Sequence, residues 1–120
     1  MSALQTRAEP RADRMADTLM SVLIEQGIVA AEVLADTLSR EYTALVQRDV
    51  TTLQHIARDK LASTEELAAV RAQLRAWAVK RSGDRANPAP IFSTELAALL
   101  ARCERQHGVN VALAARLFGR

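Results

Sequence analysis

The residues best suited to chemistry are two histidines and one cysteine, and their positions form no recognisable catalytic or metal-binding motif. His55 and His107 are far apart in the sequence, and we interpret both as surface residues. Cys103 lies close to Arg102 and Arg105, whose charges could lower the pKa of its thiol. Its position among leucines instead predicts a small buried side chain. A single cysteine also excludes an internal disulfide and suits a reducing compartment.

The acidic residues and the glycines add no sign of catalysis. Glu25, Glu32, Glu65 and Glu66 fall on expected helix surfaces, where none has the surroundings that a general acid needs. The chain has only four glycines and no glycine-rich phosphate loop. We therefore expect a protein that is not an enzyme and that uses no cofactor and no metal.

Composition favours a single all-α domain. A chain of 120 residues suits one domain, and 49% of its residues are hydrophobic, mostly Ala, Leu and Val. Ala and Leu are strong helix formers. Sheet proteins need more aromatic and turn residues than one Trp, one Tyr, two Phe, four Gly and three Pro provide.

Charge and hydropathy favour the cytoplasm. The net charge of +2 is too weak for strong binding to phosphates, so no nucleic-acid partner is expected. Basic residues dominate between Arg71 and Arg85, which we interpret as a solvated helix end. The N-terminal residues lack the apolar core of a secretory signal, and no segment approaches the apolar run that a membrane span requires.

The first expected helix runs from about Ala12 to Gln47, after a disordered lead-in over residues 1–11 that contains Pro10. Its apolar residues form one broad stripe at helical spacing: Met15, Leu19, Val22, Leu23, Val29, Ala30, Val33, Leu34, Leu38, Tyr42 and Leu45. Gly27 interrupts this stripe at a cost of about 1 kcal/mol relative to alanine. A long packed helix absorbs that cost, so we favour one helix over two shorter ones.

The second expected helix runs from about Val50 to Lys80 and carries a heptad seam. Asp49 is its predicted N-cap, because the carboxylate can accept a hydrogen bond from a free backbone N–H. The seam alternates steps of three and four residues: Leu53, Ile56, Lys60, Ser63, Leu67, Val70, Leu74 and Trp77. Lys60 would pass its charged head to solvent. Ser63 could cap a restarted helix with Glu66 as its partner, but the unshifted register favours a continuous helix.

A loop over residues 81–92, with its Gly, Asn and two Pro, separates this hairpin from a third helix. Ser93 is the predicted N-cap, and Glu95 complements the helix dipole. The third seam again alternates three and four: Leu96, Leu99, Cys103, Gln106, Asn110, Leu113 and Leu117. Residues 1–120 are therefore predicted to form one all-α domain, an elongated antiparallel helical hairpin plus a third helix in a coiled-coil-like bundle.

Two functions are open to such helices from their residues alone. Copies of the chain could cover one another's apolar faces in a self-associating structural bundle. Alternatively, the segment from Gly108 to Arg120 resembles the first helix of a DNA-binding helix-turn-helix of the Fis type, with its Ala-Ala-Arg-Leu run and terminal glycine. A DNA reader also needs a recognition helix for the major groove, and the sequence ends before one could form.

Three segments resemble the flagellar export chaperone family FlgN, and together they span about Met15 to Leu117. The first is Glu41-Tyr42-Thr43-Ala44-Leu45 with Arg48, Asp49, Leu53, Ile56 and Lys60, similar to the family's helix end, acidic turn and following helix start. The second is the Leu/Arg stretch from Leu67 to Leu74. The third is Leu99-Leu100-Ala101-Arg102-Cys103, followed by His107 and Asn110. In the family two asparagines, three apart, follow such a run, and His107 stands where the first is usual.

The resemblance implies a cytosolic export chaperone. Proteins of this family bind hook–filament junction proteins and keep their terminal helices from assembling before type III secretion, with the export apparatus as a second partner. Helix-in-groove packing covers the client's apolar stripe, and ordering a disordered client keeps the affinity modest. Family members continue into a client-binding tail, so part of the site would lie beyond Arg120. We expect a monomer or weak homo-oligomer.

The predicted partner-binding surface lies on the third helix and consists of Leu99, Leu100, Cys103, His107, Asn110, Leu113 and Leu117. The simpler interpretation is that this seam packs into the hairpin and leaves only the flank of Leu100, His107 and Ala114 exposed. Both interpretations of the third helix hold if this helix detaches from the hairpin and docks on the client. Asn110 motivates this hypothesis, because a buried amide in an apolar seam weakens packing while it fixes the register.

Overall fold

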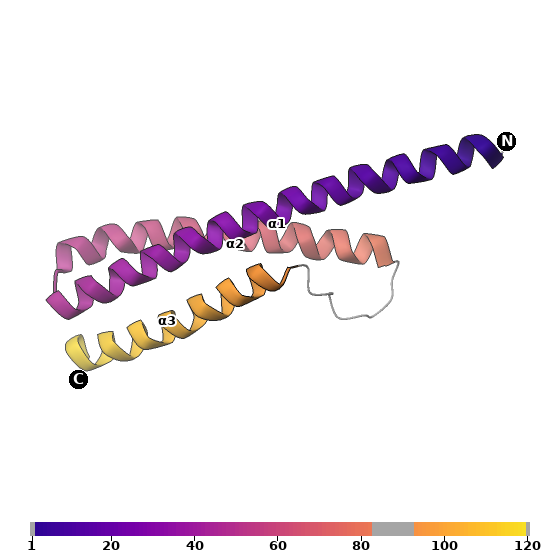
Figure 1. The fold of residues 1–120 in the computed structure, drawn as a ribbon. Coiled ribbons are helices and arrows are strands. Elements are labelled where there is room, and N and C mark those ends of the chain that lie inside the picture. The colour runs from indigo at the N-terminus through magenta and orange to yellow at the C-terminus, as the bar shows by residue number, and fades with distance from the viewer. Residues whose placement is uncertain (1, 83–92, 120) are drawn as a thin grey trace.

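The computed structural model of the protein contains three α-helices, which confirms the all-α prediction (Figure 1). It describes residues 2–82 and 93–119, and none of these forms a strand. The helices are α1 (Ser2–Gln47), α2 (Val50–Ser82) and α3 (Thr94–Phe118). The molecule measures 71 × 25 × 19 Å, because the 46 residues of α1 form one continuous rod.

The helix bounds differ from the prediction at two places. α1 begins at Ser2, so residues 2–11 are helical where a disordered lead-in was expected. The segment holds Ala, Leu, Gln, Arg and Glu, which have favourable helix propensities, whereas Pro10 lacks the N–H for one backbone hydrogen bond of the helix. α2 continues to Ser82, so the first two residues of the expected loop are helical, and residues 83–92 lie outside the described part of the chain. Neither Gly27 nor Ser63 interrupts its helix.

α1 is the central element, and both other helices pack along it. α2 runs antiparallel to α1 and α3 runs parallel to it (Figure 1). Within the described residues the backbones of α2 and α3 do not approach each other. α1 is therefore the shared packing partner of α2 and α3, and the close backbone approach between α2 and α3 of a closed three-helix bundle is missing from the described residues.

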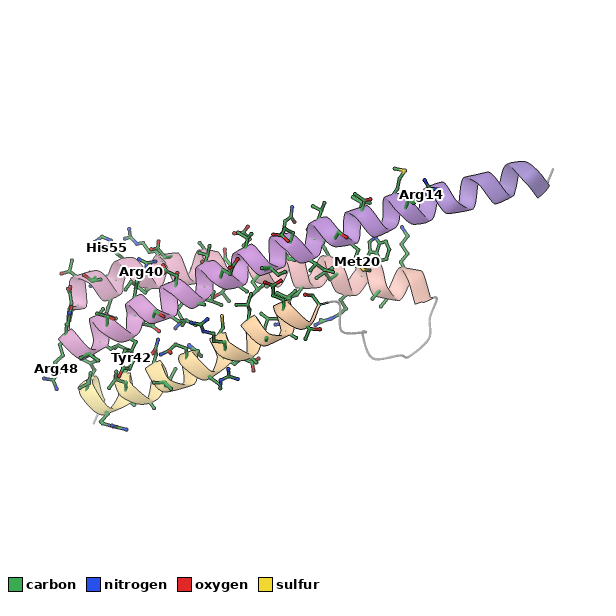
Figure 2. The ribbon with its side chains drawn as sticks, in the orientation of Figure 1. Arg14, Met20, Arg40, Tyr42, Arg48 and His55 are labelled. Atoms are coloured by element: carbon green, nitrogen blue, oxygen red, sulfur yellow. The ribbon has the colours of Figure 1, made fainter. Side chains whose placement is uncertain are left out.

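The core consists of the facing seams of the three helices. α1 contributes Ile28, Ala31, Leu34 and Leu38, α2 contributes Leu67, Val70 and Leu74, and α3 contributes Leu96 and Cys103. The heptad seam predicted for α2 faces α1, with Ile56 and Ser63 also buried. Met20 is the first described α1 residue packed against this cluster, and α1 projects beyond it toward Arg14 (Figure 2).

Gly27 faces side chains of both other helices. A Cβ atom added there would lie 3.1 Å from Leu96 Cδ2 and 3.4 Å from Val70 Cγ1. Leu96 belongs to α3 and Val70 to α2. Because Gly27 has no side chain, the side chains of both helices can pack directly against the α1 backbone at this position. This close approach explains why a glycine is accommodated within a long helix in spite of its low helix propensity.

The link between α1 and α2 is a left-handed helix cap. Arg48 has a φ of 52°, the Asp49 N–H donates to the Ala44 carbonyl at 2.9 Å, and the Arg48 N–H donates to the Leu45 carbonyl at 3.0 Å. This pattern is the Schellman motif, in which glycine usually occupies the left-handed position. Asp49 then caps α2 as predicted, because its carboxylate accepts hydrogen bonds from the Thr52 N–H and hydroxyl. These bonds lower the pKa of Asp49.

The single apolar stripe predicted for α1 is divided between a buried face and an exposed face. Leu34, Leu38 and Leu45 are buried. The exposed members are Met15, Leu19, Val22, Val29, Val33 and Tyr42. Because both faces are apolar, the segment Thr18–Gln47 is long and apolar enough to cross a membrane by length and composition, although soluble core helices meet the same criterion. The expectation that no segment approaches such a run is therefore wrong.

Candidate partner-binding groove

An apolar groove lies between α2 and α3, with α1 as its base. Leu34 and Leu38 of α1 line it, and both are buried. Leu67 lines it from α2, and Leu100 and Cys103 line it from α3. Its volume is about 330 Å³. The groove follows from the fold, because α2 and α3 both use α1 as their partner and leave the space between them uncovered.

The α3 wall of the groove carries an apolar row beyond the residues that line the cavity. Leu100, Glu104 and His107 line the cavity, and Val111, Ala114 and Phe118 follow at alternating steps of four and three residues. Residues at such steps share one face of a helix. Val111 and Phe118 are 54% and 50% exposed, so this face has no partner among the described residues.

The two rims of the groove carry different charges. Lys60 and Arg71 of α2 line one side, and Glu104 and His107 of α3 line the other. Arg71 and Glu104 are exposed, and neither forms an ion pair within the described residues. An occupant with acidic groups toward α2 and basic groups toward α3 would therefore complement the rims.

Polar side chains from all three helices meet at one edge of the groove. Lys60 Nζ lies 3.1 Å from Glu41 Oε2, and Asn110 Nδ2 donates to Glu41 Oε1 at 2.8 Å. Asn110 Nδ2 also donates to the Leu38 carbonyl at 2.9 Å, while its Oδ1 accepts from Gln106 Nε2. Lys60 was expected to pass its charge to solvent, but its side chain is only 25% exposed and is paired with Glu41.

Cys103 is a buried core residue, as its place in the α3 seam predicted. It is 5% exposed, and its thiol donates to the Ala31 carbonyl at 3.5 Å. Burial raises the pKa of the thiol, and the nearby Arg102 only partly offsets that effect. A protonated, covered sulfur is a poor nucleophile.

The structure divides the seven residues predicted to bind a partner. Leu100, Cys103 and His107 line the groove, although Cys103 is buried beneath it. Asn110 is 2% exposed and bonded to α1. Leu99 lies in a separate shallow hollow with Glu32 and Arg102, and Leu113 and Leu117 are half-buried.

Sequence reasoning missed the α2 half of the groove. Lys60, Thr64, Leu67 and Arg71 line it, and they follow one another at alternating steps of four and three. The spacing itself is visible in the sequence, because it differs from the α2 seam by one residue at two positions, Thr64 in place of Ser63 and Arg71 in place of Val70. Its meaning depends on the structural finding that the backbones of α2 and α3 do not approach each other.

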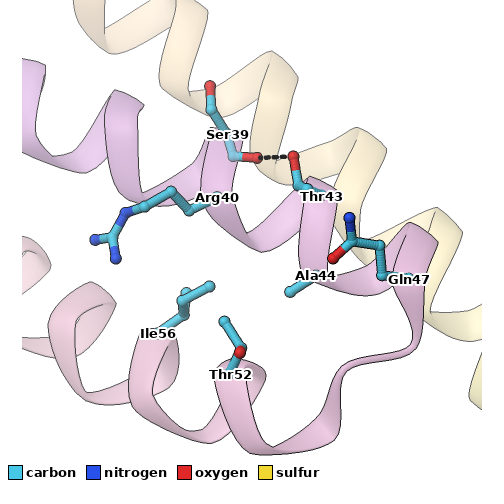
Figure 3. A pocket seen from close by; sticks show the side chains of 7 residues that line it. All are labelled: Ser39, Arg40, Thr43, Ala44, Gln47, Thr52 and Ile56. Atoms are coloured by element: carbon cyan, nitrogen blue, oxygen red, sulfur yellow. Dashed lines mark hydrogen bonds between the residues drawn. The ribbon is translucent and has the colours of Figure 1, made fainter.

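A second hollow lies at the hairpin end, between α1 and α2. Figure 3 shows the side chains that line it, among them Ser39, Arg40, Thr43 and Gln47 of α1 and Thr52 and Ile56 of α2. Its one charged group, Arg40, already contacts Asp36 and Asp59. The Thr43 hydroxyl donates to the Ser39 carbonyl. This hollow therefore offers no unpaired charge to a ligand.

The two histidines and the acidic residues form no metal centre in the part of the chain that the structure describes. His55 and His107 are both exposed, as predicted, and lie on different helices. Comparison of the chain with protein-family models, with curated proteins and with solved structures gives no match.

Proposed function

We propose that this protein is a cytosolic export chaperone similar to the FlgN family, and that the groove between α2 and α3 holds a terminal helix of a hook–filament junction protein. The observation that carries the proposal is that α2 and α3 both pack on α1 and leave an apolar channel between them. A client helix placed there would complete a four-helix arrangement. Recognition of this kind is helix-in-groove binding.

The lining of the groove suits an amphipathic helix. Leu34, Leu38 and Leu67 form its apolar base, and Leu100 extends it along α3. A client helix with apolar residues at steps of three and four would bury its stripe against this base. The charged rims would then fix the direction of the client through Arg71 on one side and Glu104 on the other.

The proposal replaces the hypothesis that α3 detaches to meet its client. Asn110 donates to both Leu38 and Glu41, so detachment would break one buried and one partly buried hydrogen bond and uncover Leu96 and Cys103. A client that enters the groove needs none of these changes. The partner surface is therefore formed by Leu100 and His107 together with the α2 wall, rather than by the whole predicted α3 seam.

The test uses a fluorescent peptide that contains the C-terminal helix of a hook–filament junction protein, titrated with the full chain. We expect saturable binding, and we expect Leu100→Glu to weaken it at least tenfold, which corresponds to about 1.4 kcal/mol. Leu100 is half-buried on the groove wall, so the substitution places a carboxylate against the client's apolar stripe. Circular dichroism checks that the variant remains helical.

Val109→Glu is the matched control. Val109 is 50% exposed and follows Leu100 by about two and a half helical turns, which places it on the opposite face of α3. It should leave the dissociation constant unchanged within about twofold. Equal binding by both variants would exclude the groove as the site. Failure of the wild-type chain to bind the junction helix, with binding of other amphipathic helices, would exclude the export client and keep the groove.

A further inference from the structure

A second apolar face of α1 is exposed to solvent. Met15, Leu19 and Val22 are 65%, 56% and 47% exposed, and Val29 and Val33 are 51% and 50% exposed. None of these five belongs to the core cluster. Soluble proteins seldom leave a contiguous row of large apolar side chains in water without a partner for it.

The spacing of this row is that of a coiled-coil seam. With Gln26 included, the positions are 15, 19, 22, 26, 29 and 33, which alternate steps of four and three. Met15, Val22 and Val29 then occupy d positions, and Leu19, Gln26 and Val33 occupy a positions. The next positions in the same register are Asp36 and Arg40, which form an ion pair, so the apolar seam ends at Val33.

We propose that this face, Met15–Val33, pairs with the same face of a second copy of the chain in a parallel two-stranded coiled coil. The copies would be related by a twofold axis along α1, and the groove between α2 and α3 would remain open. The paired length is about 27 Å at 1.5 Å per residue. An interface this short gives a reversible dimer rather than an obligate one.

Gln26 is the reason to choose a second copy in parallel register. A single polar residue at an a position sets register and strand number, because it needs a polar partner across the seam. In the parallel register Gln26 faces Gln26 of the other copy, and two amides can each donate and accept. In an antiparallel pairing centred on this seam Gln26 would face Val22, and its buried amide would have no partner.

The charges beside the seam support the same choice. Glu25 and Glu32 precede the a positions Gln26 and Val33, which makes them g residues. An antiparallel pair centred on this seam brings the g residue Glu25 of one helix to Glu25 of the other, so these two carboxylates would repel each other. A parallel pair places each g residue beside an e position of the other helix, and the e residues here, Ala30 and Thr37, carry no charge and are buried within the protomer.

A lipid bilayer is a weaker occupant of this face. The membrane-length segment Thr18–Gln47 includes Glu25, Glu32, Asp36, Arg40 and Glu41. Insertion would also strip α2 and α3 from the buried face of α1. Helices that lie on membrane surfaces carry Lys and Arg beside their apolar face, whereas this seam is flanked by Glu25 and Glu32.

Sedimentation equilibrium of the full chain tests the proposal over a loading range from about 5 to 500 μM. We expect the mass to rise from one protomer to two. Val22→Glu and Val29→Glu should each keep the chain monomeric over that range, and both sites are exposed in the protomer, so folding should persist. Ser21→Glu, one residue from the seam and also exposed, should dimerise like the wild type.

Cysteine cross-linking tests the register. Under mild oxidation, each of the variants Val22→Cys and Val29→Cys should form a disulfide that joins the new cysteine to the same cysteine of the other copy. This is expected because a parallel pair places identical positions opposite each other. Ser21→Cys should not, and Cys103 is buried in every variant. A monomer at all concentrations, a trimer or tetramer, or a cross-link only between Val22→Cys and Gln26→Cys would overturn the proposal. Co-sedimentation of a monomer with anionic vesicles would assign the face to membrane.

Discussion

Glu41 connects the three helices through a single carboxylate. It accepts from Asn110 of α3 at 2.8 Å and pairs with Lys60 of α2 at 3.1 Å, and its side chain is only 15% exposed. A partly buried ion pair gains little over an apolar pair, because desolvation offsets the attraction. Its effect is on specificity, since only one sliding position of α3 along α1 brings Asn110 to Glu41 and to the Leu38 carbonyl.

Replacement of Glu41 by leucine tests this interpretation. The variant leaves the Lys60 ammonium and the Asn110 amide without their acceptor, and we expect the free energy of unfolding to fall by about 2 kcal/mol. Urea denaturation measures it. Lys60→Met in the same background should restore part of the loss, because it removes the unpaired charge. A loss below about 0.5 kcal/mol would mean that water replaces Glu41 at no cost.

Arg48 is a second residue whose role is set by backbone geometry. Its φ of 52° places a residue with a Cβ in the left-handed region, which costs about 1 kcal/mol relative to glycine. Arg48→Gly should therefore raise the stability of the hairpin by up to that amount, less the entropy that glycine adds to the unfolded chain. Chemical denaturation measures the change. Arg58→Gly, inside α2, is the opposite control and should destabilise.

At the scale of elements, Gly27 controls how closely α2 and α3 approach α1. Gly27→Ala gains about 1 kcal/mol of helix propensity, but its methyl group meets Leu96 at 3.1 Å, so we expect a net change near zero. Gly27→Leu adds a side chain that must push Val70 or Leu96 aside, and it should cost about 2 kcal/mol. Gly108, which has no neighbour within 4 Å, is the control. Gly108→Ala should stabilise the protein.

The sequence alone predicts the three helices and the buried face of α2. It does not predict which helices pack against each other. The heptad spacing from Leu53 to Trp77 predicted the buried face of α2, and Asp49 and Ser93 marked where helices begin. The broad α1 stripe concealed two faces, because residues three and four apart can belong to either of two neighbouring seams. Whether α3 touches α2 depends on long-range packing around Gly27 and Glu41, which no local pattern encodes.

At the scale of the whole molecule, three sides of α1 have different roles. One side carries α2, another carries α3, and the third is the exposed seam from Met15 to Val33. The groove lies between the first two, and the seam is separate from it. A client in the groove and a second copy on the seam would therefore bind independently, and a dimer would present two client sites.

The projecting end of α1 should report on this arrangement. The described α1 residues before Met20 extend beyond the core cluster (Figure 2), and a lone helix of that length is marginal in water. Amide hydrogen exchange around Leu19 should be fast in dilute protein and slower at concentrations where the dimer forms, while Leu38 stays protected throughout. In Val22→Glu the exchange around Leu19 should remain fast at every concentration. Slow exchange there in a dilute monomer would show that α1 is stable alone and that the exposed seam needs no second copy to order it.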